Sequence, residues 1–276
     1  MKNSKSIKEF AELQYKTHQN LTARMNLWSY GSNPESLQEW IFSKIQIQEC
    51  ERVLELGCGT GQLWLENFKN VPSTCSIILS DFSKGMVDKA KNNVQPLSLP
   101  IDFEIIDAEN IPYPNQVFDV VIGCHMLYHI PDIQKALMSI SRVLKPSGRF
   151  ISTTVSQLHM RELNEFLSEF GLYSEERMKL FGEFRNENGR DFLNPFFSDI
   201  EFYEYINQVN ISSVDPIMSY IESMFPIEES SDFQEKKTEI KEAIVKILEK
   251  RSKFKITGIS GLFEAKRPTN SILGKQ

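Results

Sequence analysis

Three glycines stand within five positions of the stretch RVLELGCGTGQLW, residues 52–64, directly after an apolar run that contains the acid Glu55. Without side chains at Gly57, Gly59 and Gly61, the backbone can turn sharply and a ligand can approach its N–H groups. The turn lacks the Lys and Ser/Thr of a triphosphate-binding loop, and its G-C-G-T-G spacing departs from the G-x-G-x-x-G pattern of dinucleotide sites. Because Glu55 would repel a phosphate, the pattern favours a cationic ligand; the alternative is a tight turn with a purely structural role.

Further polar groups follow the next two apolar runs. Asp81 comes about 20 residues after the last glycine, where a carboxylate can accept hydrogen bonds from both hydroxyls of a ribose. Asp107 and Ala108 follow the third run, where a carboxylate and a backbone N–H suit the amino group and a ring nitrogen of adenine. Phe82 and Met86 are candidates to sandwich the adenine ring, although a Met at helical spacing is also typical of a core. Together these residues predict a site for an adenosine-containing ligand.

The candidates for acid–base chemistry lie in GCHMLYHIPD, residues 123–132, after the fourth apolar run. His125 and His129 are its titratable groups near neutral pH, and Tyr128 lies beside them. A general base is needed only where the acceptor of a transferred group must lose a proton, as a hydroxyl does. We therefore interpret both histidines as candidate catalytic residues, with a structural role as the alternative.

The elements that must position these residues alternate along the chain. The apolar runs predict strands at 52–56, 75–80, 101–106, 118–123 and 148–155. Several runs are apolar at consecutive positions, which is typical of strands buried on both faces of a parallel sheet. The segments between them predict helices at 61–70, 83–94 and 132–145. Ser83 is the expected cap of the second helix, and KPSG is expected to close the third. Strict alternation indicates a doubly wound α/β sheet with its ligands at the carboxyl ends of the strands.

The last third of the chain continues the pattern and adds helices to it. Strands are predicted at 200–209 and 253–267, and further helices at 157–195, 214–224 and 232–250. The charge-rich last helix is typical of a solvated face.

Residues 50–155 resemble the class I S-adenosylmethionine-dependent methyltransferases that act on small molecules. The resemblance rests on five blocks in the family's order: VLELGCGTG, SDFSKGMVDKAK, DAENIPYPNQVFDVVIG, LYHIPD and RVLKPSGRF. It implies a Rossmann-like sheet of seven strands with the last strand antiparallel, and S-adenosylmethionine as cofactor. It also implies the cofactor contacts: the methionine moiety at Glu55, Gly57, Gly59 and Gly61, the ribose at Asp81, the adenine at Asp107 and Ala108, and further contacts at Cys58 and Cys124. The expected reaction is in-line transfer of a methyl group to a small-molecule acceptor, which demands no metal.

Three regions are expected along the chain. Residues 1–50 form a helical N-terminal lid, 51–155 the S-adenosylmethionine-binding core, and 156–276 the second half of the sheet with helical cap insertions. The expected lid and acceptor-contacting residues are Tyr15, Arg24, Trp28, Tyr30 and Tyr128. The alternative is that the aromatic residues of the first region pack it onto the sheet.

The composition narrows the classes of function. The 276-residue chain has a formal net charge of −6, which disfavours a nucleic-acid or anionic-membrane partner because those bind clustered Lys and Arg. No segment has the apolar character of a signal peptide or a membrane span, so we expect a cytoplasmic protein. The four scattered cysteines predict reduced core thiols. Two other functions stay open: binding of S-adenosylmethionine without turnover, and dinucleotide-dependent oxidoreduction. These residues do not determine the acceptor or the oligomeric state.

Overall fold

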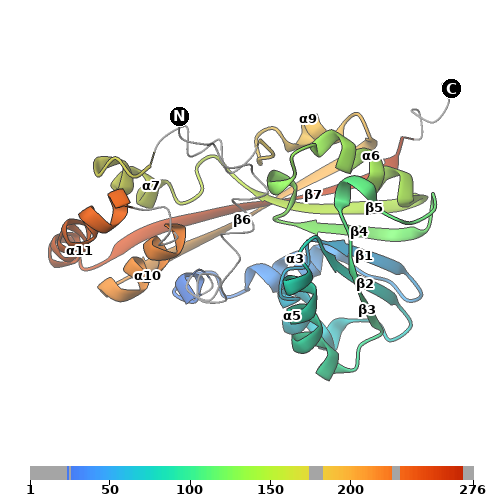
Figure 1. Cartoon of the computed structure of the whole chain (residues 1–276), viewed down its shortest axis with the longest axis horizontal. Helices are drawn as coiled ribbons and strands as arrows, with labels where there is room; N and C mark the ends of the chain where they lie inside the picture. The colour runs from blue at the N-terminus through green and yellow to red at the C-terminus, as the bar shows by residue number, and fades with distance from the viewer. Residues whose placement is uncertain (1–23, 25, 174–182, 226–230, 270–276) are drawn as a thin grey trace. The chain divides into compact units, whose positions relative to one another are not determined.

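The computed structural model describes residues 24, 26–173, 183–225 and 231–269 (Figure 1). The strands are β1 Arg52–Leu56, β2 Ser76–Asp81, β3 Ile101–Ile105, β4 Phe118–Cys124, β5 Leu144–Val155, β6 Phe197–Ile211 and β7 Phe254–Pro268. The α-helices are α3 Leu37–Ile45, α4 Gln62–Asn67, α5 Lys84–Val94, α6 Ile133–Val143, α7 Arg161–Glu169, α9 Gly189–Leu193, α10 Val214–Met224 and α11 Ser231–Arg251. Short 3₁₀ turns are η1 Phe68–Asn70, η2 Gln95–Leu97, η3 Ala108–Asn110 and η4 Leu127–His129.

The strands form one seven-stranded sheet in the order β3-β2-β1-β4-β5-β7-β6. The pairs β1–β2, β1–β4, β2–β3 and β4–β5 are parallel, and β5–β7 is antiparallel. The prediction of a doubly wound sheet whose last strand is antiparallel is therefore confirmed. The strand order reverses between β1 and β4, and a sheet of this kind binds its ligands outside the carboxyl ends of the strands at such a point.

Helices cover both faces of the sheet because successive side chains of each strand point to opposite sides. Leu54 and Leu56 of β1 belong to a buried cluster that includes the apolar side of α6. Val53 belongs to a second cluster, formed with α3, α4 and α5. Figure 1 shows α6 and α9 on one face and α3 and α5 on the other.

The KPSG segment differs from expectation. It was predicted to close a helix, but α6 ends at Val143 and β5 begins at the next residue. Leu144 pairs with Phe118 of β4, and the register then shifts before Arg149 pairs with Val120. The chain thus enters the sheet as soon as the helix ends, because the buried Leu144 is already part of the core.

Two smaller expectations are also corrected. Ser83 occupies the N-cap position of α5, but its hydroxyl makes no capping hydrogen bond. The carboxylate of Asp81 instead accepts the backbone N–H of Ser83 at 2.8 Å. Not all cysteines are core thiols: all four are free, Cys58 and Cys75 are buried, but Cys50 is exposed in a loop with φ +62°.

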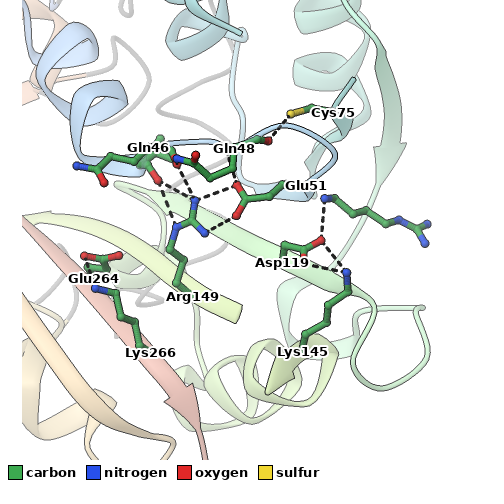
Figure 2. A network of polar contacts seen from close by, with 11 residues as sticks. Gln46, Gln48, Glu51, Cys75, Asp119, Lys145, Arg149, Glu264 and Lys266 are labelled. Carbon is green, nitrogen blue, oxygen red and sulfur yellow. Dashed lines mark hydrogen bonds and ion pairs between the residues drawn. The ribbon is translucent and has the colours of Figure 1, made fainter. Parts of the chain in front are cut away.

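Hydrogen bonds and ion pairs connect side chains at the amino-terminal ends of the strands, as Figure 2 shows. Arg149 of β5 donates to both carboxylate oxygens of Glu51, at 2.6 and 3.0 Å, and to the carbonyl oxygens of Ile45 and Gln46. Asp119 of β4 accepts from Lys145 Nζ at 2.8 Å and from the backbone N–H that opens β1. These contacts anchor the link between α3 and β1 at the edge opposite the predicted site.

The chain divides into two compact units, each made of several segments. The sheet unit comprises Glu35–Gln157, Glu183–Tyr205 and Ser260–Gln276; the helical unit comprises Met1–Pro34, Leu158–Gly182 and Ile206–Ile259. The helical unit has its own apolar core, built from α7, α10, α11 and the parts of β6 and β7 that belong to it. The expected functional regions 1–50, 51–155 and 156–276 are contiguous, whereas these units are not, and the functional division stays a prediction.

Candidate functional site

The glycine turn between β1 and α4 adopts the backbone that only glycine tolerates well. Gly57, Gly59 and Gly61 have φ of +70°, +54° and +76°. A Cβ on Gly61 would lie 2.7 Å from Cγ2 of Val94, so this glycine also lets α5 approach the turn. A Cβ on Gly59 would meet no atom within 4 Å. The middle of the turn therefore borders open space, as a ligand-binding turn requires.

Asp81, the last residue of β2, holds this turn in place. Its Oδ2 accepts the backbone N–H of Gly59 at 3.1 Å, while Oδ1 accepts that of Ser83 at 2.8 Å. Burial raises the pKa of Asp81, and these two hydrogen bonds oppose that change. Each carboxylate oxygen has a further lone pair, so Asp81 can bind two hydroxyls while it keeps both backbone donors.

Glu55 is a buried carboxyl, 2% exposed, one residue before the end of β1. Burial raises its pKa to about 7; a hydrogen bond from Trp64 lowers it, and the charge of Asp81 raises it. A carboxyl with this pKa changes its charge near neutral pH. The pair of acids predicted from the sequence thus lies together at the carboxyl ends of β1 and β2.

The predicted adenine contacts lie at the end of β3, next to β2. The backbone N–H of Ile106 donates to the carbonyl oxygen of Asp81 at 3.2 Å, which joins the two strand ends. Asp107 accepts the N–H of Glu109 at 2.9 Å and so caps η3, whose first residue, Ala108, is buried. Phe82 has 47% of its surface exposed and offers an aromatic face beside Asp81. Met86, in the first turn of α5, is half-buried.

Both cysteines of the site are protonated thiols at neutral pH. Burial raises the pKa of Cys58 well above its ordinary value, and the charges of Glu55 and Asp81 raise it further. Burial likewise raises the pKa of Cys124, and Glu55 adds to this effect. Since the thiolate is the nucleophilic form, neither cysteine is poised for covalent catalysis.

The two candidate histidines follow β4. His125 has a left-handed backbone, φ +52°, and its N–H donates to the carbonyl oxygen and to Oγ1 of Thr153 on β5. Its ring Nε2 is buried and, among the described residues, has no hydrogen-bond partner. Burial lowers the pKa of His125 to about 4, so the ring is neutral at physiological pH. His129 ends η4, with its ring centroid 4.5 Å from that of Tyr128.

The expected lid residues that the structure describes belong to the helical unit. Arg24 donates to Oγ and to the carbonyl oxygen of Ser223, near the end of α10. Trp28 packs on Gly258 of β7 and lies 5.6 Å, centroid to centroid, from His159. Tyr30 is 45% exposed. Tyr15 lies outside the described residues, and the lid remains a prediction.

Two residues that contribute to the site were not predicted. Trp64 of α4 donates to Glu55, and Thr153 of β5 holds the backbone of His125. Trp64 follows the glycine turn by one helical turn, a position that faces back toward β1. Thr153 carries no local signal, because its partner is 28 residues away in the chain.

Other features of the described residues lie apart from this site. A hollow of about 450 Å³ borders β3 and the end of α5, and no predicted site residue lines it. Among the described residues, no group of three or more His, Cys, Asp or Glu side chains is arranged to hold a metal ion. In the same part of the chain, no helix is both long and apolar enough to cross a membrane.

A doubly wound sheet with a glycine turn after β1 and acids at the ends of β1, β2 and β3 defines the class of α/β folds that bind an adenosine-containing cofactor. A methyltransferase domain family matches residues 47–187. The chain therefore belongs to the methyltransferase domain family, as the resemblance of its motifs indicated.

Individual relatives agree with this assignment. Demethylmenaquinone methyltransferase from Lactobacillus johnsonii is 34% identical over 126 residues, 45% of this chain and 51% of that protein. The ubiquinone/menaquinone biosynthesis C-methyltransferase UbiE from Rickettsia bellii is 30% identical over 179 residues, 58% of this chain and 71% of that protein. The chain spans about half the length of the first of these relatives.

Among solved structures, phosphoethanolamine N-methyltransferase 2 from Haemonchus contortus, in complex with phosphomonomethylethanolamine and S-adenosylhomocysteine, has the same fold. Its TM-score is 0.57 at 18% identity, and the similarity covers 98% of this chain and 62% of that chain.

Proposed function

We propose that this chain is an S-adenosylmethionine-dependent methyltransferase that acts on a small-molecule acceptor. The observation that carries the proposal is the hydrogen bond between Gly59 and Asp81, which joins a glycine turn bordering open space to an acid at the next strand end. This arrangement places the glycine turn and a carboxylate that suits a ribose on one edge of the sheet. The family to which the chain belongs supports the same activity.

The residues present fit this cofactor. The acid Glu55 suits the ammonium group of the methionine moiety, and Asp81 suits the ribose hydroxyls. Asp107 with the N–H of Ala108 suits the adenine edge, and the exposed ring of Phe82 suits its face. Glu55 would repel a phosphate beside the glycine turn, and the G-C-G-T-G spacing departs from the dinucleotide pattern; both disfavour the dinucleotide alternative.

The cofactor, when bound, supplies a methyl group on a sulfonium centre, which a lone pair of the acceptor displaces in line. His125, which directly follows β4, is neutral, but a pKa of about 4 makes it a weak base, so it is the second candidate to take a proton from a hydroxyl acceptor. His129, with Tyr128 against its ring, is the first candidate for this role. The protonated thiols of Cys58 and Cys124 do not compete for the methyl group as thiolates.

The acceptor is proposed only as a small molecule. The relatives are named for demethylmenaquinone and for ubiquinone/menaquinone biosynthesis, but the family match ends at residue 187, and much of the helical unit follows it. The net charge of −6 supports a small molecule over a nucleic acid. We also propose that the segment containing Arg24, Trp28 and Tyr30 orders over the bound ligand, and that the protein is cytoplasmic.

Transfer of a labelled methyl group from S-adenosylmethionine to an extract of small metabolites tests the activity. We expect a labelled product together with S-adenosylhomocysteine, and clearly less of both with Asp81→Ala at the same subsaturating cofactor concentration. Binding of the cofactor without any transfer across several extracts would favour the non-catalytic binding protein instead.

A further inference from the structure

Trp64 makes a contact that the predicted cofactor site does not by itself explain. Its side chain is fully buried, and its indole Nε1–H donates to Oε2 of Glu55 at 2.6 Å. The ring of Phe42, on α3, meets the Trp64 ring edge-on at a centroid distance of 6.2 Å. The indole is thus held by packing from a second helix, and its N–H direction is fixed. A short hydrogen bond to a buried carboxylate belongs to the stronger kind.

The second oxygen of Glu55 is left available by this arrangement. Among the described residues, Oε1 accepts no hydrogen bond, whereas Oε2 is engaged by the indole. A buried carboxylate is stable only when more than one donor binds it. Oε1 is therefore the oxygen to which a cationic group of a ligand would bind.

We propose that Trp64 is a positioning residue for the cofactor: its indole N–H holds the Glu55 carboxylate with Oε1 presented to the ammonium group of the methionine moiety. This inference rests on the proposed function. Trp64 itself does not touch the cofactor and acts through Glu55.

The same hydrogen bond also affects the charge of Glu55. The titratable groups around it are Asp81 of β2, Cys58 of the glycine turn and Cys124 of β4. Burial and the Asp81 charge favour the protonated carboxyl, the two thiols stay neutral, and the indole N–H favours the carboxylate. Removal of the indole N–H therefore shifts Glu55 toward its neutral form, which binds an ammonium group poorly.

The test is isothermal titration of S-adenosylhomocysteine between about pH 5.5 and 8.5, where Glu55 changes its charge. With the wild-type protein, the affinity should rise as the pH rises, and the midpoint of this change should lie near the pKa of Glu55, about 7. With Trp64→Phe, we expect affinity to fall about tenfold at pH 7 and the midpoint to rise by about one pH unit. Glu55→Gln should remove this pH dependence, and adding Trp64→Phe to that variant should not create one.

Trp40→Phe is the matched control. Trp40 is buried in the same apolar cluster and packs on Tyr205 at a centroid distance of 5.3 Å, so this variant loses similar packing without touching Glu55. An unchanged midpoint in Trp64→Phe, or an equal rise in Trp40→Phe, would overturn the positioning role. Failure of the wild-type protein to bind S-adenosylhomocysteine at any pH would instead overturn the proposed function, and the inference with it.

A second measurement needs no variant at position 64 and covers the case in which Trp64→Phe does not fold. In wild-type protein with ¹⁵N-labelled tryptophan, the Trp64 indole resonance should titrate with the same midpoint as the affinity and should shift when S-adenosylhomocysteine saturates the site. A resonance that stays constant through that pH range would contradict the proposal.

Discussion

Replacement of Glu55 by Gln is expected to stabilise the ligand-free protein at alkaline pH. Burial raises the pKa of Glu55 from 4.5 to about 7, so the folded state binds this proton more tightly than the unfolded state. Below pH 4.5 both states are protonated and the group contributes nothing. As pH rises from 4.5 to 7, the folded state loses stability relative to the unfolded state, and above pH 7 the loss is constant.

The size of this loss follows from the pKa difference. A difference of about 2.5 pH units corresponds to about 3 kcal/mol at 1.36 kcal/mol per unit. The side-chain amide of the Glu55→Gln variant keeps an oxygen that can accept the indole N–H of Trp64, so the substitution removes the charge and retains this contact. Any cost of burying the new amide N–H groups does not depend on pH.

Urea unfolding of both proteins at pH 5 and pH 8 measures the effect. We expect the free energy of unfolding of wild-type protein, relative to Glu55→Gln, to fall by about 2–3 kcal/mol between these pH values. A difference between the two proteins that is the same at both pH values would refute a raised pKa for Glu55 and the reasoning built on its burial.

Three further predictions concern the site. Asp81→Ala should weaken S-adenosylhomocysteine binding about tenfold or more, because hydrogen bonds to charged groups contribute roughly 1.5–3 kcal/mol. Arg149→Ala, at the opposite edge of the sheet, is the control and should lower Tm but leave the affinity unchanged. Weaker binding by Arg149→Ala with unchanged binding by Asp81→Ala would mean that Asp81 does not bind the ribose. Gly59→Val should abolish binding but retain the folded circular dichroism spectrum, since its Cβ meets no atom within 4 Å while its φ of +54° disfavours a β-branched residue; normal affinity would mean that the turn is only structural. Hydrogen exchange in residues 26–33 should slow when S-adenosylhomocysteine binds, and equal exchange in both states would assign this segment to packing and not to a lid.

The parts of the fold that could be predicted from the sequence are those with local signals. The strand β1 is apolar at consecutive positions because both faces of the sheet are covered, and three glycines mark the turn after it. Asp81 and Asp107 could be predicted because each directly follows an apolar run in the sequence, and parallel strands bring their carboxyl ends to one edge.

Other contacts depend on how distant segments pack, which local patterns do not record. The bond from Arg149 to Glu51 joins residues 98 positions apart, and the bond from Arg24 to Ser223 joins residues 199 apart. The hydrogen bond from the Trp64 indole to Glu55 likewise depends on how α4 packs against β1. The helical unit is assembled from three separate segments. A division of the sequence into contiguous regions therefore cannot reproduce its boundaries.

The most direct test of the central claim is isothermal titration of the purified wild-type protein with S-adenosylhomocysteine and, separately, with NAD at pH 8, where Glu55 is ionised. We predict saturable binding of one S-adenosylhomocysteine per chain and no heat of binding with NAD. A folded protein that binds NAD, or that binds neither compound, would contradict the claim that the glycine turn, Glu55 and Asp81 form an S-adenosylmethionine site.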